Sequence, residues 1–411
     1  MQEIADIQPK PLFTDNWLRK ALYKKLSLIK DASLTIYDSE GMHHFGDKTA
    51  ELSAQITIQN PEFFRSLALG GSVGAGESYM NRDWQVDDLT QLVQIFVRNM
   101  DVLDDVDGGS VWAKMLVMKV LHWFSRNSKS GSKKNIAAHY DLGNDFFKLF
   151  LDSKLMYSSA IYQSDEDTLE QASSRKLDTI CQRLDLKDTD HLLEIGTGWG
   201  GLAIFAAQHY GCKVTSVTIS KEQLAEAQQR VKAHGLEDKV EVLFKDYRDI
   251  EGQYDKVVSV EMVEAVGHQY LDGYFNKIAN VLKPNGLALI QAITIREERY
   301  LQALHTVDFI KRYIFPGSFI PSALVLADSA AKSSLLVNDK SEFGQSYAKT
   351  LRDWRIAFLD NLDKVKQQGY SDSFIRMWLF YLCYCEGGFL EESINVVHMR
   401  FEKVEETGVD S

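Results

Sequence analysis

The sequence predicts an α/β protein built on a doubly wound, mostly parallel sheet, with a smaller N-terminal α+β domain and helical C-terminal additions. Two observations predict the sheet. Between residues 190 and 295, short apolar strand patterns alternate with helical patterns. A glycine-rich turn, residues 196–201, follows the first strand at once and leads into another helical pattern. Alternation of this kind is typical of parallel strands joined by crossover helices.

Five segments in this region are predicted as strands, and turn residues such as those at 283–286 introduce them. They are residues 191–195, 213–218, 240–244, 256–260 and 288–294. From Arg296 to the end of the chain the pattern becomes helical and aromatic. We therefore expect helical additions after the last strand.

The clearest domain boundary is the small, polar and basic stretch 126–135, which is typical of an exposed linker. Residues 1–125 form the predicted N-terminal domain, and residues 136–411 form the second domain. Apolar spacing in the first domain predicts the following elements. They are helices at 17–29, 89–97 and 111–124, and strands at 33–37 and 52–58.

The segment 111–124 has apolar side chains almost all round, with Lys114 and Lys119 among them. Two interpretations stay open. It is a buried helix at a domain interface, or it is a membrane-surface helix whose lysines lie near lipid headgroups. With the basic linker, it predicts that the N-terminal domain docks on lipid or forms a homodimer.

Composition excludes several functional classes. The chain has 411 residues, of which 45% are hydrophobic and 25% charged, as in ordinary globular proteins. A net charge of −12 argues against nucleic-acid binding, which requires a basic face. Four cysteines show no disulfide framework, and neither a signal-peptide pattern nor a long apolar span is present. We expect a cytoplasmic protein without a membrane span.

The turn Gly196-Thr197-Gly198-Trp199-Gly200-Gly201 follows Glu194 at the end of the first strand. Glycine lets the backbone turn tightly and approach a ligand closely, and the next helix presents free N–H groups. The pattern is neither the dinucleotide fingerprint nor a phosphate loop. It favours the S-adenosylmethionine loop of a class I methyltransferase, with Glu194 and the four glycines as cofactor-binding residues. The alternative is an ordinary glycine-rich turn.

The ends of the next strands supply further candidates for the cofactor site. The second strand ends without an acidic residue, so Thr218 and Gln223 are the available hydrogen-bonding groups. After the third strand, Asp246 offers an acceptor for the adenine amine and Tyr247 an aromatic face. The alternative for Asp246 is an exposed loop carboxylate.

Two acids, Glu261 and Glu264, follow the fourth strand, where the sulfonium is expected. Residues three apart lie on one face of a helical turn. A carboxylate there balances positive charge or supports a base. The alternative role is capping of a helix N-terminus.

Several long motifs occur in order between about residues 135 and 400. They are at residues 139–147, 156–160, 193–201, 217–220, 246–249, 259–264, 313–317 and 381–389. Together they resemble the cyclopropane-fatty-acyl-phospholipid synthase family. The resemblance implies that S-adenosylmethionine alkylates the cis double bond of an unsaturated acyl chain in a membrane phospholipid. Proton loss from the new methyl group then closes a cyclopropane ring.

The resemblance also implies a base site. In the family a bicarbonate ion takes the proton, and its ligands fall here on Glu264, the backbone of Ile293 and Tyr347. Ser159 stands where the family has a cysteine, and Gln291 where it has a histidine. The same resemblance places Tyr157 and Ser158 at the methionine end of the cofactor.

The two departures leave the product open. Serine and glutamine still form hydrogen bonds, but neither titrates near neutral pH. A changed base site predicts a methyl-branched or methylene-bearing chain as the alternative to a cyclopropane. Two further alternatives are a small apolar acceptor and a lipid-binding protein without turnover. The leading hypothesis is an enzyme peripheral to the inner face of the membrane.

Overall fold

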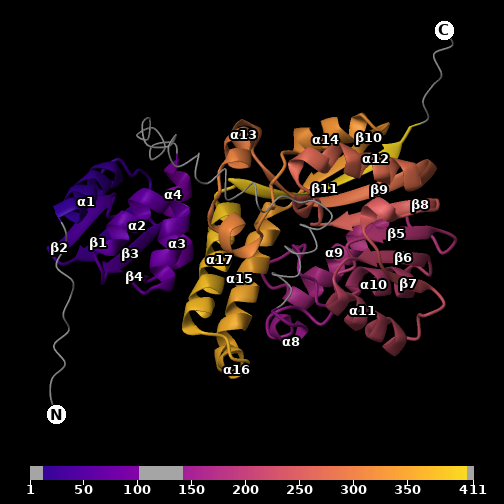
Figure 1. Ribbon diagram of the computed structural model, residues 1–411, viewed down its shortest axis with the longest axis horizontal. Helices are drawn as coiled ribbons and strands as arrows, with labels where there is room; N and C mark the ends of the chain where they lie inside the picture. The colour runs from indigo at the N-terminus through magenta and orange to yellow at the C-terminus, as the bar shows by residue number, and fades with distance from the viewer. Residues whose placement is uncertain (1–12, 101–141, 405–411) are drawn as a thin grey trace, which may run out of the picture. The chain divides into compact units, whose positions relative to one another are not determined.

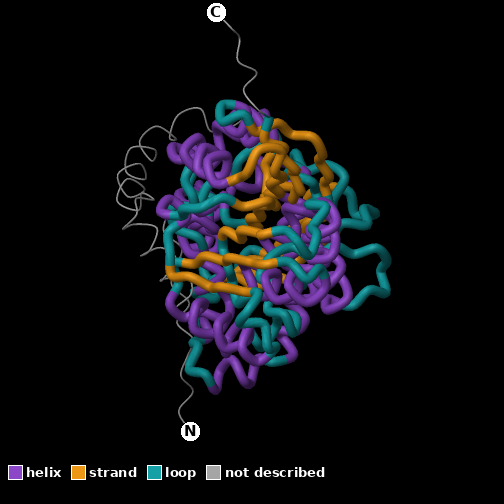
Figure 2. The backbone as a smooth tube through the Cα atoms, turned by 90° about the vertical axis from the view of Figure 1, so that its right-hand side faces the viewer, coloured by secondary structure: helices purple, strands orange, loops and turns teal. Residues whose placement is uncertain are grey.

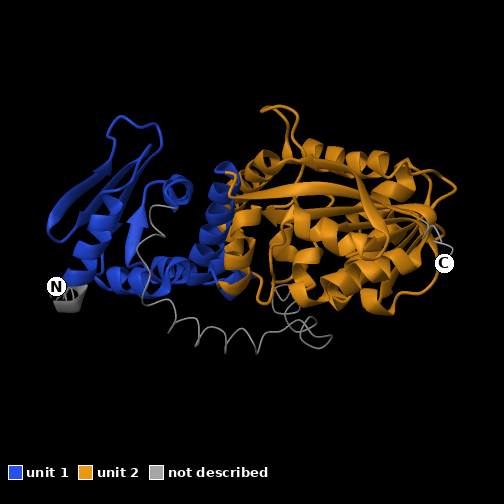
Figure 3. Ribbon diagram, turned by 90° about the horizontal axis from the view of Figure 1, so that it is seen from above, with its two compact units in different colours: residues 1–119, 307–314, 366–391 blue, residues 120–306, 315–365, 392–411 orange. Residues whose placement is uncertain are grey.

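The computed structural model describes residues 13–100 and 142–404, which divide into two compact units (Figures 1 and 3). The first unit contains residues 13–100, 307–314 and 366–391, and the second contains the rest. The chain therefore returns twice to its N-terminal unit. The predicted helix 111–124 and the predicted linker 126–135 lie outside the described residues.

The first unit is built on a four-stranded sheet of order β2-β1-β3-β4. Its strands are β1 (Ser33–Asp38), β2 (Gly41–Gly46), β3 (Ser53–Ile58) and β4 (Trp84–Val86). Its helices are α1 (Phe13–Leu26), α2 (Glu62–Gly70), α3 (Ser72–Met80), α4 (Leu89–Arg98) and α17 (Asp372–Leu390), with a π-helical turn at Ile310–Ile314. The predicted strands at 33–37 and 52–58 and the helix at 89–97 are confirmed, while α1 ends before the predicted residue 29.

Helix α17 packs closely against the N-terminal helices of this unit. A Cβ on Gly387 would lie 2.7 Å from a methyl carbon of Val93, so the two helices approach where glycine leaves room. The guanidinium of Arg376 lies 3.7 Å from the ring centre of Tyr79 and donates to backbone carbonyls of α3 and β4. Residues 366–391 are thus part of the core of the first unit.

The second unit contains a seven-stranded sheet of order β10-β11-β9-β8-β5-β6-β7. Five neighbouring strands are parallel, namely β5 (His191–Ile195), β6 (Lys213–Thr218), β7 (Val240–Phe244), β8 (Tyr254–Val260) and β9 (Leu282–Ile295). All five predicted strands are confirmed, with β8 and β9 beginning earlier than predicted. The doubly wound, mostly parallel sheet is therefore confirmed.

The prediction of a purely helical region after Arg296 is wrong in two places. Strand β11 (Ile394–Lys403) pairs antiparallel with β9, and β10 (Leu335–Glu342) pairs antiparallel with β11. In β11 four consecutive residues, 396–399, are buried, so the strand has no alternation that marks it. β10 is an edge strand with mostly polar residues, and this composition concealed it.

Helices cover both faces of this sheet (Figures 1 and 2). One apolar core contains Tyr274, Phe275 and Leu326, and the other contains Ile180, Leu202 and others. The helices of the unit are α8 (Asn144–Phe147), α9 (Leu169–Arg183), α10 (Gly201–His209), α11 (Lys221–Ala233), α12 (Leu271–Val281), α13 (Glu297–His305), α14 (Ala323–Ala331) and α15 (Gly344–Asp360); α16 (Leu362–Gln367) spans the division between the units. None of the helices in the described part of the chain is long and apolar enough to cross a bilayer.

Candidate active site

The glycine-rich turn connects β5 to α10 at the carboxyl end of the parallel strands, where doubly wound sheets bind ligands. Gly196, Gly198 and Gly200 have φ values of 102°, 52° and 82°, which side chains rarely adopt. A Cβ on Gly201 would lie 2.6 Å from Sδ of Met156, whereas one on Gly198 would meet nothing within 4 Å. The turn is therefore packed tightly behind Gly201 and open at Gly198. This geometry fits the close approach of S-adenosylmethionine.

The bulky Trp199 is accommodated because its side chain packs in the protein interior against Phe147. It is buried, and its indole Nε1 donates a 2.7 Å hydrogen bond to Oδ1 of Asn144. The guanidinium of Arg230 donates to the Trp199 carbonyl oxygen over 2.8 Å. These bonds hold the turn in one conformation before any ligand binds.

A buried ionisable cluster lies behind the turn. Glu194 accepts a hydrogen bond from the Ser216 hydroxyl, and the wholly buried Lys176 donates to Oγ of Ser158 over 2.8 Å. Burial raises the pKa of Glu194 to about 8 and lowers the pKa of Lys176 to about 8. Sequence reasoning missed Lys176. Its signal was a lysine on the mostly apolar face of α9 that also carries Ile180.

The remaining cofactor candidates lie at the ends of the strands beside β5. The Thr218 hydroxyl donates to Oε1 of Gln223 over 3.0 Å. Asp246 is buried and forms an ion pair of 2.6 Å with Arg248, so it is not an exposed loop carboxylate. The ring of Tyr247 lies beside it and is partly buried. Their contacts with ribose and adenine stay predictions.

Tyr157 and Ser158 lie on the segment that precedes α9. The Tyr157 ring stacks on Trp354 with a centroid separation of 5.2 Å and also contacts Phe147. Ser158 is held by Lys176 as described. An aromatic wall thus lies next to the residues that the resemblance places at the methionine end of the cofactor.

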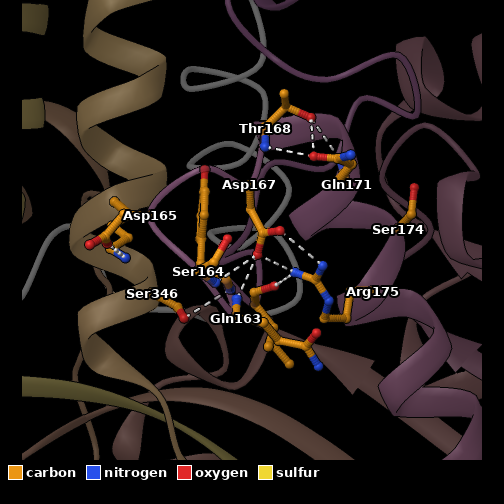
Figure 4. A network of polar contacts seen from close by, with 12 residues as sticks. Gln163, Ser164, Asp165, Asp167, Thr168, Gln171, Ser174, Arg175 and Ser346 are labelled. Carbon is orange, nitrogen blue, oxygen red and sulfur yellow. Dashed lines mark hydrogen bonds and ion pairs between the residues drawn. The ribbon is translucent and has the colours of Figure 1, made fainter.

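A polar network fixes this segment between α9 and α15 (Figure 4). Asp167 accepts hydrogen bonds of 2.7 and 3.1 Å from Arg175 and one of 2.6 Å from the Gln163 backbone N–H. The Tyr162 N–H donates to Oγ of Ser346 over 3.1 Å. These contacts position the site residues 157–159, which lie just before this segment in the chain.

Glu261 lies at the end of β8, and its carboxylate is the centre of the site. The residue is partly buried, and three donors surround its carboxylate. Oε1 accepts from the Ser159 backbone N–H over 2.9 Å and from Nε2 of Gln291 over 2.8 Å, and Oε2 accepts from the Tyr347 hydroxyl over 2.7 Å. The Ser159 hydroxyl instead donates to the Ala160 carbonyl oxygen. Ser159, Gln291 and Tyr347, which sequence reasoning assigned to one site, do converge, and they converge on Glu261.

Glu264, a partly buried residue, provides a second carboxyl group. Its Oε1 accepts a 2.6 Å hydrogen bond from the Ile293 backbone N–H. Its Oε2 is buried and has no hydrogen-bond partner among the described residues. Burial, and then the nearby charge of Glu261, raise the pKa of Glu264 to about 8. Burial also raises the pKa of Glu261, but its three hydrogen bonds and the Lys176 charge oppose this. Three donors and the Lys176 charge thus favour the ionised form of Glu261, whereas Glu264, with a single donor, favours the neutral form.

His398 is a site residue that the sequence did not reveal. It faces Gln291 across the β9–β11 ladder, and its Nε2 lies 2.8 Å from Oε1 of Gln291. The Gln291 amide nitrogen must face the carboxylate of Glu261, which only accepts, so His398 donates through Nε2. Burial lowers the pKa of His398 well below its ordinary value, and the ring is neutral. The single sequence signal is a histidine inside an apolar run.

The chain matches the family model of mycolic acid cyclopropane synthetase over residues 127–399. It is 38% identical over 343 residues to a tuberculostearic acid methyltransferase of Mycobacterium tuberculosis, covering 81% of this chain and 79% of that protein. It is 36% identical over 356 residues to the cyclopropane-fatty-acyl-phospholipid synthase of Escherichia coli, covering 87% and 90% respectively.

Solved structures agree with these matches. A cyclopropane synthase from Mycobacterium tuberculosis superposes with a TM-score of 0.62 at 28% identity, over 66% of this chain and 98% of that one. A mycolic acid cyclopropane synthase complexed with SAH superposes with a TM-score of 0.61 at 29% identity, over the same shares. The chain therefore belongs to the mycolic acid cyclopropane synthetase family and is an S-adenosylmethionine-dependent methyltransferase of the class I fold.

Proposed function

We propose that this enzyme alkylates the cis double bond of an unsaturated fatty acyl chain in a membrane phospholipid and gives a cyclopropane fatty acyl chain. The observation that supports this most is the partly buried pair Glu261 and Glu264, which follows β8, the strand paired with β5 that leads into the glycine-rich turn. Bound S-adenosylmethionine supplies an electrophilic methyl group. An alkene attacked in this way leaves a carbocation, which requires a dry site, negative charge and a proton acceptor.

The residues of the chain have separate tasks in this proposal. Gly196, Gly198, Gly200 and Gly201 let the backbone approach the cofactor. Thr218, Gln223, Asp246 and Tyr247 contact its ribose and adenine, and Tyr157 and Ser158 contact its methionine end. The rings of Tyr157 and Trp354 stabilise developing positive charge through their faces. Glu194 fixes the strand end through Ser216.

A methyl-branched or methylene-bearing chain is the second candidate product. Two observations favour it. Ser159 and Gln291 replace the cysteine and histidine that the resemblance implies, and one relative with 38% identity is named a tuberculostearic acid methyltransferase. A second relative with 38% identity, from Pseudomonas putida, is named a probable fatty acid methyltransferase. The alkylation step is common to both products, and they differ in the fate of the carbocation.

The proposal includes a place of action. A phospholipid substrate requires contact with a membrane surface, so we propose a cytoplasmic enzyme that is peripheral at the inner face of the membrane. The N-terminal unit docks on lipid or forms a homodimer in this proposal. Exposed apolar side chains at Trp17 and Leu69 support contact of that unit with an apolar partner.

The test is mass spectrometry of acyl chains after expression in a host that makes unsaturated phospholipids and lacks this activity. A gain of CH2 with the double bond lost, and a ring identified by NMR, supports the cyclopropane product. A gain of CH2 with a methyl branch or a retained alkene supports the second candidate. Unchanged lipids would contradict both and would favour a small apolar acceptor or a lipid-binding protein without turnover.

A further inference from the structure

The carboxylate of Glu261 has one acceptor position left. Each carboxylate oxygen has two lone-pair directions. Oε1 uses both of its directions, for the Ser159 N–H and the Gln291 amide, while Oε2 uses one for Tyr347. The second direction of Oε2 remains for a proton. The three donors fix the orientation of the group, so the free position is fixed as well.

The same contacts favour the ionised form of this carboxylate and oppose the effect of burial on its pKa. Hydrogen bonds to the charged form favour that form, and Lys176 adds an opposite charge nearby. Glu264 takes the proton of the pair because its Oε1 has a single backbone donor and its Oε2 has no partner among the residues described. A group that is to accept a proton must be unprotonated beforehand, and the three hydrogen bonds to Glu261 favour that state.

The backbone holds Glu261 in a conformation that an ordinary residue avoids. Its φ is +48°, in the left-handed region that favours glycine, and its N–H donates to the Gln291 carbonyl oxygen over 2.8 Å. Strained residues of this kind cluster at active sites. A glycine would relieve the strain, so a structural role alone does not account for a glutamate here.

We propose that Glu261 is the base that removes the proton from the new methyl group, so that the enzyme requires no bicarbonate. This inference rests on the proposed function. In the step, one C–H bond of the new methyl group, next to the carbocation in the acyl chain, breaks. The proton goes to Oε2 of Glu261, and the electron pair of that bond forms the second C–C bond of the ring. The carboxylate becomes a neutral acid, and no oxidant or reductant takes part.

The donors explain why an external anion is not needed. Ser159, Gln291 and Tyr347 are the residues that the resemblance implies around bicarbonate. In this chain they already donate to Glu261. A bicarbonate ion in the same place would have to displace a covalently attached carboxylate whose effective concentration is far higher.

Two variants test the proposal. Glu261→Gln keeps the size of the side chain and removes the base, and Glu261→Gly removes the side chain and relieves the positive φ. Glu237→Gln, at an exposed surface position, is the matched control. Binding of S-adenosylmethionine by calorimetry and the melting temperature show whether each variant is folded.

We expect the wild type to have the same kcat in CO2-depleted buffer and in buffer with added bicarbonate. Glu261→Gln should lower kcat by at least about 100-fold, with cofactor affinity unchanged. Glu261→Gly should be equally slow and should regain activity with bicarbonate. Stimulation of the wild type by bicarbonate, or a normal kcat of folded Glu261→Gln, would overturn the proposal.

A binding measurement separates this inference from the proposed function. Carbon-13 line broadening of labelled bicarbonate, recorded without S-adenosylmethionine, should show binding to Glu261→Gly and none to the wild type. Saturable binding to the wild type that is absent in Glu261→Gly would contradict the inference, even where the wild type makes the expected lipid. A wild type that makes no altered lipid instead overturns the proposed function.

Discussion

The two carboxyl groups of the site show how surroundings give one residue type two chemical states. Glu261 has three donors and a buried cation near it, while Glu264 has one donor. Both carboxyl groups are partly withdrawn from water, which favours their neutral form. The difference in hydrogen bonding then decides which group holds the proton. A buried pair of this kind supplies a base and a neutral acid within one site.

The protonation state of Glu264 gives an expected pH dependence. Its pKa is raised to about 8, so the group is protonated below that pH and loses its proton as the pH rises through that value. The second negative charge then repels the carboxylate of Glu261 and disturbs the orientation that its three donors give it. The groups that face Glu264 are Glu261 and the buried Tyr274, while Lys176 faces Glu261.

We therefore expect kcat to fall as the pH rises through about 8. A base without a neighbouring carboxyl group would instead give a kcat that rises with pH. The measurement is kcat from pH 6 to 10 with saturating substrates. The side chain in Glu264→Gln cannot ionise. We therefore expect this variant to have a lower kcat than the wild type, but a kcat that does not decline at alkaline pH. A wild-type rate that stays constant to pH 10 would contradict the assigned state of Glu264.

His398 is a positioning residue because it acts through Gln291. His398→Leu leaves the side-chain oxygen Oε1 of Gln291 buried without a donor. The loss of this donor costs about 1–3 kcal/mol in free energy and allows the side-chain amide to rotate. We expect kcat to fall about tenfold, which corresponds to about 1.4 kcal/mol, with the KM for S-adenosylmethionine unchanged. His398→Gln retains a donor and should recover part of the rate. Equal rates for the two variants would show that the hydrogen bond has no role.

At the scale of elements, helix α9 contributes a charge to the interior. Lys176 lies at zero exposure near Asp152, Glu194 and Glu261. Removing one partner from a buried ionic group leaves the others uncompensated. We expect Lys176→Met to lower the free energy of unfolding by about 3–5 kcal/mol, measured by urea denaturation. Lys187→Met, at an exposed ion pair with Asp185, should change it by less than about 1 kcal/mol.

The junction of β5 and α10 depends on glycine for space. An added Cβ at Gly201 would lie 2.7 Å from the Lys154 carbonyl oxygen and 2.6 Å from Met156, so backbone must shift. Gly201→Ala should therefore lower the affinity for S-adenosylmethionine by about tenfold or more, equivalent to about 1.4 kcal/mol. Gly273→Ala, on an open face of α12, is the control and should leave binding unchanged. The affinity of both variants for S-adenosylmethionine is measured by calorimetric titration, and equal affinities would contradict the prediction.

At the scale of the whole molecule, the chain returns to its N-terminal unit with α17. Thr90 donates to Glu386, and Arg98 forms an ion pair of 2.7 Å with Glu391. A truncation that removes residues 1–125 would leave this helix without its packing partners. We expect the truncated protein to be insoluble or to show no cooperative unfolding. A soluble, cooperatively folding product would contradict the division of the chain into these two units.

Much of the site was predictable as a set of positions but not as an arrangement. Ser159, Glu264, Gln291, Ile293 and Tyr347 were identified through the resemblance, and the glycine turn through its own pattern. For Glu261 the sequence allows both a catalytic role and capping of a helix N-terminus. His398 and Lys176 were not found, because a buried polar residue inside an apolar segment has the same local sequence whether or not it contacts a site.

The sequence by itself determined the five parallel strands, the glycine turn and the family of the chain. These depend on local periodicity and on backbone sterics, which neighbours in the chain decide. Only the tertiary structure decided that Glu261 meets Ser159, Gln291 and Tyr347, and that α17 belongs to the first unit. Those contacts join residues far apart in the chain. They depend on the register of β9 with β11 and on packing of α15, which no local pattern encodes.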